Sequence, residues 1–409
     1  MAERVIRVGM VGLGMIVDET YLPAFRQRCG PVTFAAAASR TGRRGEKLLG
    51  EWPTLANFAG ADSVPQMLRA GVDAVCVATP DDRHFEPARL ALEAGKHVLI
   101  EKPSVLSLAE LDELTALAER NGVLAKVVYH KLLDPDHKKL RTHVADGVLR
   151  HVNNGYCSLL EPKSISGGQF AEWITGRNPA TYVAVHYLKL IDFTFGPDWT
   201  LSRVTATGQR GLVGPADGPT WDSVQSQVVY THPDGREAAF DVHTSWVTPD
   251  DFPGTSSRVP GSNSTTRVWN AHQRKRGVEV CVEGKTPHAM KNTPNHHYNG
   301  TFLEPWGERS QRGYGIEAVS RFFDEVAHVE HSGPAGEREQ RLRAVRGLAY
   351  NDLTADRNVV ATVQAIEAIL AAHASGRPGS VVRANGSGGG LVQWFPGERE
   401  PAVLYAGRV

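Results

Sequence analysis

A run of apolar residues close to the start of the chain ends in a Gly-x-Gly turn. Residues Val8 to Val11 have the composition of a buried strand, and Gly12 and Gly14 follow directly. Gly12 permits a tight turn after the strand, and Gly14 lets backbone N–H groups approach a pyrophosphate at the start of the next helix. This order predicts the first βαβ unit of a dinucleotide-binding fold. A glycine-rich strand exit that binds no nucleotide is the alternative.

The turn departs from Gly-x-Gly-x-x-Gly at its third position, which is Val17. Pro23 is expected to delay the following helix, with Thr20 as its N-cap, so that the proline falls in the first turn. The residues of this turn expected to bind the cofactor are Gly12, Gly14, Met15 and Ile16.

The second strand, residues 32–38, ends at Ser39 and Arg40, about 25 residues after Gly14. A carboxylate normally binds the ribose 2′-hydroxyl of NAD at this place. A hydroxyl followed by Arg40, with Arg44 close behind, offers donors and positive charge to a 2′-phosphate, so NADP is favoured, with NAD as the second choice. The alternative is that these arginines form a solvated helix start.

Length and charge narrow the class of protein. A chain of 409 residues suits two domains, expected at 1–130 for the dinucleotide and at 131–409 for substrate binding and oligomerisation. Equal numbers of basic and acidic residues, 45 each, leave no basic footprint for nucleic acid. The chain has no apolar run of membrane-spanning length and no secretory leader, so a cytoplasmic protein is expected. Four scattered cysteines predict neither a disulfide framework nor a zinc site.

Strand and helix patterns alternate up to about residue 130, as a doubly wound parallel sheet requires. One buried strand, 72–78, ends at Thr79 and Pro80, and another, 96–100, ends at Glu101 and Lys102. Ligands bind beyond the carboxyl ends of such strands, so Lys102 is expected at the cofactor crevice. A helix from Ser107 to Glu119, with a Ser107–Glu110 capping box, and a strand from Val123 to Tyr129 complete the expected domain.

Longer alternating segments after residue 130 predict an α+β domain with one large, mainly antiparallel open sheet. The segments are 151–161, 201–209, 224–232, 237–246, 265–271 and 277–284. Helices at about 178–195, 316–329 and 355–374 are expected to cover one face of this sheet. The other face is left for a partner subunit, which predicts a homodimer or homotetramer.

The stretch from Asn178 predicts a helix with polar groups on one face. Asn178 is a good N-cap and the following proline fits the first turn. Tyr182, His186 and Lys189 then stand at i, i+4 and i+7. Three titratable groups on one stripe are costly to bury, so a polar cleft is expected. The alternative is a Tyr–His pair within a core and a lysine that reaches water.

The chain resembles the family of glucose–fructose oxidoreductases and inositol dehydrogenases over essentially its whole length. The likeness rests on the Gly-x-Gly turn, Thr79-Pro80 followed by His84, Glu101-Lys102-Pro103, and the helix with His186. The resemblance implies Thr79, Pro80, His84, Glu101 and Lys102 at the cofactor, and Lys102 beside the nicotinamide and a substrate hydroxyl. It also implies a sugar, polyol or glycoside as the substrate.

The family's later helix usually carries Asp-x-x-x-His-x-x-Asp, whereas this chain has Tyr182, His186 and Lys189 at those positions. His186 is carried over, but a carboxylate-assisted mechanism is not. Hydride transfer at a carbinol carbon needs an acid–base group and a cation that steadies the charge on oxygen. His186 or Tyr182 is expected to carry the proton. Lys102 is expected to polarise the oxygen and is a further candidate for the proton.

Lys189 is expected to lower the pKa of a neighbouring group or to contact an acidic substituent. No metal is expected. Side chains expected at the substrate rim, each of which alone also fits a core or surface position, are Tyr129, Lys131, Trp173, Arg177, Trp246, His296, His297 and Tyr298.

Three functions from different classes stay open. The first is an NAD(P)-dependent oxidoreductase that acts on a carbohydrate or polyol. The second is a glycosidase of the same fold that keeps its nicotinamide bound and acts by transient oxidation. The intact Glu101-Lys102-Pro103 sequence favours the first over the second. The third is a non-enzymatic, NADP-sensing regulator, which the presence of both Lys102 and His186 disfavours.

Overall fold

The computed structural model describes residues 5–27, 31–147, 154–164, 173–195, 198–249, 266–268, 271–273, 277–281, 290–294, 297–385 and 389–407. Contacts divide the chain into two compact units. The first unit comprises Met1–Asp134 and His297–Val360, and the second comprises Pro135–His296 and Ala361–Val409. This division differs from the expected pair of continuous segments that meet at residue 130, because residues 297–360 pack with the first unit.

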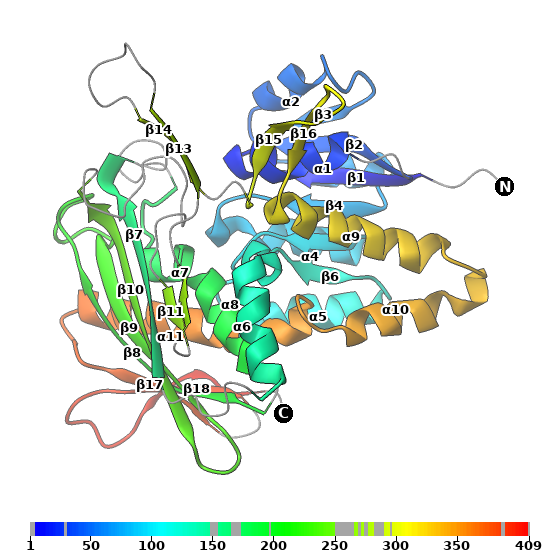
Figure 1. Ribbon diagram of the computed structural model, residues 1–409. Coiled ribbons are helices and arrows are strands. Elements are labelled where there is room, and N and C mark those ends of the chain that lie inside the picture. Colours follow the sequence, from blue (N-terminus) through cyan, green and yellow to red (C-terminus); the bar gives the residue numbers. More distant parts are fainter. Residues whose placement is uncertain are drawn as a thin grey trace. The chain divides into compact units, whose positions relative to one another are not determined.

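The first unit is built on a six-stranded parallel sheet in the order β3-β2-β1-β4-β5-β6 (Figure 1). Its strands are β1 (Ile6–Val11), β2 (Val32–Ser39), β3 (Ala56–Ala59), β4 (Ala74–Val77), β5 (His97–Ile100) and β6 (Ala125–Val127). The doubly wound fold expected for this part of the chain is thereby confirmed. The strand order reverses between β1 and β4, and ligands of such sheets bind beyond the carboxyl ends at this point.

The helices α2 (Arg43–Leu48), α3 (Ser63–Arg69), α4 (Phe85–Glu93) and α5 (Leu108–Arg120) connect these strands. Two helices from later in the chain, α9 (Tyr314–His331) and α10 (Arg338–Gly347), belong to the same unit. The expected cap of α5 is present, since the backbone N–H of Glu110 donates to Ser107 Oγ at 3.3 Å.

The helix after β1 begins at Met15, directly after the Gly-x-Gly turn, and not at Thr20 as expected. It passes through a π-helical turn, Val17–Tyr21, into α1 (Leu22–Arg26). Pro23 therefore lies inside the helix, where it has no N–H for the carbonyl of Glu19 four residues earlier. That carbonyl instead accepts a hydrogen bond from Asn299 Nδ2 at 2.6 Å. The π turn and this distant amide together accommodate the proline.

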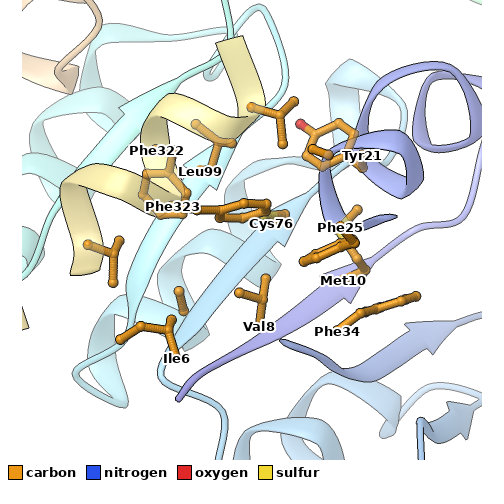
Figure 2. Packing of buried hydrophobic residues seen from close by; sticks show 14 of the residues in the cluster. Ile6, Val8, Met10, Tyr21, Phe25, Phe34, Cys76, Leu99, Phe322 and Phe323 are labelled. Atoms are coloured by element: carbon orange, nitrogen blue, oxygen red, sulfur yellow. The ribbon is translucent and has the colours of Figure 1, made fainter. Parts of the chain in front are cut away.

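Helix α9 completes the core of the first unit. Val319, Phe322, Phe323 and Val326 form one buried stripe of this helix. Figure 2 shows Phe322 and Phe323 directed at side chains of the sheet strands and at Phe25 of α1. The rings of Phe25 and Phe323 stack with their centroids 5.0 Å apart. The expectation that this helix covers the sheet of the second unit is therefore wrong.

The second unit contains a nine-stranded sheet in the order β12-β11-β7-β10-β9-β8-β17-β18-β19. Neighbouring strands are antiparallel except β7 and β10, which confirms a mainly antiparallel sheet. Its strands are β7 (Asn154–Pro162), β8 (Thr200–Gln209), β9 (Ser223–Thr231), β10 (Glu237–Thr248), β11 (Thr266–Val268), β12 (Ala271–Gln273), β17 (Val381–Asn385), β18 (Gly390–Trp394) and β19 (Ala402–Tyr405). Along β10 every second side chain is buried, so one face of this strand is covered.

Two short hairpins stand apart from the large sheets. The expected strand at 277–284 becomes β13 (Gly277–Cys281), which pairs only with β14 (Met290–Pro294) among the described strands. The other hairpin, β15 (Gly300–Leu303) and β16 (Arg309–Arg312), belongs to the first unit. Further helices are α6 (Pro135–Ala145), α7 (Pro179–Tyr182), α8 (Val185–Phe195) and α11 (Arg357–Ala374).

No helix within the described ranges combines the length and apolar character needed to cross a membrane. Cys76 and Cys157 are buried free thiols. Cys29 lies outside the described residues.

Candidate active site

The candidate site of the first unit lies where four neighbouring strands end. Backbone hydrogen bonds continue past the strands and fix the exits: Ala78 N–H donates to Val11 O, and Glu101 N–H donates to Val77 O. The exit of β6 is held in the same way, because Val128 N–H donates to Ile100 O at 2.8 Å. The segments after β1, β4, β5 and β6 therefore lie side by side at one edge of the sheet.

Position 12 requires a glycine, because the exits of β1 and β4 lie very close together there. Its φ is +84°, and a Cβ there would lie 2.6 Å from the carbonyl oxygen of Ala78. The next helix starts one residue after Gly14, so its first turn directs N–H groups and the positive end of its dipole toward the switch point. Met15 and Ile16 form this first turn, in which both are half-buried. These residues fit the pyrophosphate of a dinucleotide.

Glu101 fixes the N-terminal side of the segment that follows β5. Its buried Oε1 accepts a hydrogen bond from Tyr21 Oη at 2.9 Å. Burial raises the pKa of the Glu101 carboxyl, while the charge of Lys102 and the Tyr21 hydrogen bond act in the opposite direction. The role of Tyr21 is not apparent from the sequence, since nothing in its local pattern distinguishes it from an ordinary core tyrosine.

His84 joins the exits of β4 and β5. Its Nδ1 lies 2.7 Å from the carbonyl oxygen of Pro103, and its Nε2 lies 2.8 Å from that of Thr79. Burial lowers the pKa of His84, while the hydrogen bonds to the two carbonyl oxygens and the charge of Asp81 act in the opposite direction. The ring is buried between two backbone segments. His84 therefore holds these two segments together, and the cofactor contact that the resemblance implied stays a prediction.

Thr79 and Pro80 lie at the exit of β4 and are half-buried, with Thr79 Oγ1 donating to the carbonyl of Arg83 at 3.0 Å. Thr79 thus keeps its place beside the switch point while its hydroxyl holds the following turn.

The buried carboxylate of Asp356 accepts hydrogen bonds from two hydroxyl groups, one of which belongs to the segment that bears Lys102. Asp356 Oδ2 accepts from Ser104 Oγ at 2.6 Å, and Asp356 Oδ1 accepts from Tyr129 Oη at 2.7 Å. All three side chains are buried. Tyr129, expected at the substrate rim, thus has its hydroxyl committed to the interior of the first unit. Asp356 was missed because it lies 227 residues from Tyr129 in the sequence.

A cluster of aromatic and basic side chains follows β6. Burial, then the charges of Lys102 and Lys131, lower the pKa of His130 to about 3, so this ring is neutral. Lys131 Nζ donates to Tyr314 Oη at 3.1 Å and lies 3.5 Å from Asp134 Oδ2. Lys131 is therefore a largely buried group with an acidic partner.

Tyr298 belongs to the same cluster. Its ring centroid lies 5.6 Å from that of His130 and 5.4 Å from that of Tyr314. His297, the residue expected at the rim, is exposed. Of these two rim candidates, Tyr298 is therefore the one that packs within the cluster after β6. His296 lies outside the described residues.

The expected 2′-phosphate residues differ in their surroundings. Ser39 Oγ accepts the backbone N–H of Gly42 at 3.1 Å, and Arg40 is exposed beside it. Arg44 forms an ion pair with Asp18 of the first helix. Arg40 is thus the side chain of this group that is best placed to meet a ligand.

In the second unit the expected single helix 178–195 is interrupted. Asn178 caps α7 as expected, with its Oδ1 accepting the Thr181 N–H at 2.9 Å, but α7 ends at Tyr182 and α8 begins only at Val185. Tyr182 and His186 are half-buried. The ring of Tyr182 lies 5.9 Å from that of Trp246, which is fully buried and so is not a rim residue.

Lys189 does not face an open cleft. Its side chain is 1% exposed, and its Nζ lies 3.8 Å from Asp192 Oδ2, three residues further along α8. This pairing gives no support to the expectation that Lys189 lowers the pKa of a neighbouring group or contacts an acidic substituent, because its charge is balanced within the helix.

Arg177 is also part of the scaffold. Its Nη2 lies 3.1 Å from Glu367 Oε1 on α11, and the same oxygen accepts from Asn178 Nδ2 and from Thr181 Oγ1. Arg177 thus holds the start of α7, and its expected place at the substrate rim stays a prediction. Trp173, a few residues earlier, is half-buried.

Within the part of the chain that the structure describes, no group of three His, Cys, Asp or Glu residues is arranged to hold a metal ion.

Residues 6–129 match the model of an oxidoreductase family with an NAD-binding Rossmann fold. Among curated proteins, the oxidoreductase YdgJ of Escherichia coli is 33% identical over 149 residues, which are 36% of this chain and 41% of that protein. The D-glucoside 3-dehydrogenase of Escherichia coli is 27% identical over 203 residues, 48% of this chain and 56% of that protein. The chain thus spans about half the length, or less, of these two relatives.

Two solved structures show the same fold at low identity. An inositol dehydrogenase homologue of Azotobacter vinelandii, solved with NADH and myo-inositol, superposes with a TM-score of 0.62 at 18% identity over 93% of this chain and 98% of that one. The 3-ketoreductase KijD10 of Actinomadura kijaniata, solved with NADP, gives a TM-score of 0.57 at 19% identity over 89% and 97%. Residues 6–129 thus carry the NAD-binding Rossmann fold of the oxidoreductase family that includes the glucose–fructose oxidoreductases and inositol dehydrogenases.

Proposed function

We propose that the protein is an NAD(P)-dependent oxidoreductase that moves a hydride to or from a hydroxyl or keto carbon of a sugar, polyol or glycoside. The observation that carries this proposal is the place of Lys102. It follows β5, next to the switch point of the sheet, between Glu101 held by Tyr21 and Ser104 held by Asp356. Relatives named as a D-glucoside 3-dehydrogenase and an NADP-dependent scyllo-inositol 2-dehydrogenase support the substrate class.

The bound nicotinamide supplies the hydride donor or acceptor. Lys102 polarises the substrate oxygen, because an ammonium stabilises the negative charge that develops there. His186 or Tyr182 carries the proton, since each has an ionisable group and a half-buried side chain. Lys189 takes no part in this scheme because Asp192 neutralises it.

NADP is the proposed cofactor, with NAD as the second choice. The support is the exposed Arg40 after β2, together with the absence of an acidic residue at positions 39 and 40. A charge-assisted phosphate contact contributes about 1.5–3 kcal/mol, so Arg40→Ala is expected to weaken NADPH binding by about 10- to 100-fold and to leave NADH binding unchanged. Fluorescence titration measures both affinities.

The exposed Arg343 of α10 offers the matched control for this titration. Arg343→Ala removes an equal charge and is expected to leave both affinities at the wild-type value. Equal NADPH affinity in Arg40→Ala and wild type would remove the assignment of the 2′-phosphate to this position.

The activity is tested by absorbance at 340 nm with NAD⁺ and NADP⁺ against hexoses, inositols and methyl glycosides, and with NADH and NADPH against their keto forms. Cofactor-dependent turnover with at least one of these compounds is expected. Failure of both dinucleotides to bind in the titration would overturn the proposal.

A bound-cofactor glycosidase is the second candidate. A glycosyl hydrolase family 109 protein of Streptomyces coelicolor is 29% identical over 253 residues, 54% of this chain and 51% of that protein. Release of free sugar from a p-nitrophenyl glycoside without a net change at 340 nm would select this function. The expected homodimer or homotetramer and the cytoplasmic location stay predictions.

A further inference from the structure

The segment that bears Lys102 is attached to a residue far along the chain. Ser104, two residues after Lys102, is completely buried, and its hydroxyl donates to Asp356 at 2.6 Å. Asp356 ends the short 3-10 helix Leu353–Asp356 and directly precedes α11. The attachment therefore lies only two peptide bonds from the candidate catalytic lysine.

The second oxygen of the same carboxylate holds the neighbouring strand exit. Tyr129 donates its hydroxyl to Asp356 Oδ1 at 2.7 Å, and the next residue along the chain is His130. The charge of Lys102 acts on His130, so the two groups are electrostatic neighbours. One carboxylate thus fixes the exit of β5 and the exit of β6 at the same time.

The strength of this arrangement follows from its charge. Hydrogen bonds to an ionised carboxylate are about twice as strong as those between neutral groups. Asp356 also stands at the N-terminal end of α11, where the helix dipole favours negative charge. Asp356 has 0% exposure, so water does not compete for either oxygen.

We propose that Asp356 is a positioning residue of the site: it sets the place of Lys102 through Ser104, and that of His130 through Tyr129, without contacting substrate. The proposal rests on the assignment of Lys102 to the active site under the proposed function. Because a displacement of about 1 Å at a reacting group costs about 100-fold in rate, loss of either bond to Asp356 is expected to be seen in turnover.

The test observes Lys102 itself. Lysine side chains of the full-length protein are reductively methylated with ¹³C-formaldehyde, and the Lys102 resonance is identified by its absence in Lys102→Arg. Its chemical shift and titration are then followed in wild type, Ser104→Ala and Asp356→Asn, without cofactor. Both variants are expected to move the Lys102 resonance and its apparent pKa. Ser104→Ala keeps the test valid if Asp356→Asn does not fold.

Tyr350→Phe is the matched control. Tyr350 also donates its hydroxyl to a buried carboxylate, Glu325, at 2.9 Å, and that carboxylate pairs with Lys126 and not with the segment after β5. The control is expected to lower the free energy of unfolding as the other variants do, while the Lys102 resonance keeps its place. An unmoved Lys102 resonance in both Ser104→Ala and Asp356→Asn would overturn the proposal and leave Asp356 a purely structural residue.

Turnover separates this proposal from the proposed function. With the compound that wild type turns over fastest in the 340 nm assay, Ser104→Ala and Asp356→Asn are expected to lower kcat about 10- to 100-fold, with NADPH affinity unchanged. A moved resonance in a protein that turns over no compound would uphold the positioning role and reject the function. Normal kcat in a variant whose Lys102 resonance is unmoved would uphold the proposed function and reject the positioning role of Asp356.

Discussion

Lys102 and Lys189 were both expected in the site, yet their surroundings differ in kind. Lys102 follows a parallel strand, in a segment that Glu101 and Ser104 fix on either side. Lys189 lies within α8, is 1% exposed, and pairs with Asp192. The order of strands in a parallel sheet dictates where a strand exit lies. A residue on a helix stripe meets the site only if the helix is continuous and that stripe is not the buried one.

The largest expected effect that tests the contrast between Lys102 and Lys189 is on turnover. Lys102→Ala is expected to lower kcat by about 10²–10⁴-fold and to leave NADPH affinity largely intact, because it removes electrostatic assistance to the reaction and keeps the expected contacts to the pyrophosphate and the 2′-phosphate. His186→Ala is expected to fall in the same range. Steady-state kinetics and fluorescence titration measure the two quantities. A Lys102→Ala enzyme with nearly wild-type kcat would remove the lysine from the chemistry.

Tyr182→Phe distinguishes the two proton carriers in the same assay. It keeps the ring and its contact with Trp246 but removes the ionisable oxygen. A large loss of kcat at unchanged stability assigns the proton to Tyr182, whereas a nearly normal rate assigns it to His186.

The second effect is on stability. Lys189→Met leaves Asp192 without its buried partner, and breaking a buried pair typically costs about 3–5 kcal/mol. Because Asp192 is partly exposed, we expect urea denaturation to show a loss of unfolding free energy near the lower end of this range. In the folded fraction, kcat is expected to stay largely unchanged. The double variant Lys189→Met/Asp192→Asn is expected to recover part of the stability. If Lys189→Met were as stable as wild type but catalytically impaired, Lys189 would have to be assigned to the active site.

The smallest effect is a pH dependence that tests the packing of α9. Glu330 of α9 is partly buried, which raises its pKa, but hydrogen bonds from His97 and Arg338 outweigh this and hold the pKa at about 2. A carboxyl whose pKa is depressed in the folded state contributes stability that is present above its unfolded pKa and lost as the pH falls through its folded value. The free energy of unfolding should therefore decline between about pH 4.5 and pH 2.

Glu330→Gln is expected to flatten this decline. Glu339→Gln is the control, since Glu339 pairs with Arg343 on the surface of α10. Identical slopes in wild type and Glu330→Gln would mean that α9 is not joined to His97 as described.

The sequence predicted the parallel sheet and the place of Lys102 because strand exits follow from the alternation of strand and helix. It misplaced the first helix because Pro23 is accommodated by Asn299, which is remote in sequence. It assigned α9 to the wrong sheet, since an amphipathic pattern indicates that a face is buried but not what covers it. Tyr21 and Asp356 were missed for the same reason: their partners lie 80 and 227 residues away.

The return of residues 297–360 to the first unit governs the order in which a nascent chain can finish folding. Phe25 leaves the ribosome early, but its stacking partner Phe323 is made about 300 residues later, after strands β7 to β12 of the large sheet. The first unit therefore waits with part of its apolar surface uncovered while residues 135–296 of the second are synthesised, a period in which such surfaces favour aggregation. A fragment that stops at residue 134 would keep the nucleotide-binding turn and lose the helix that seals the core beneath it.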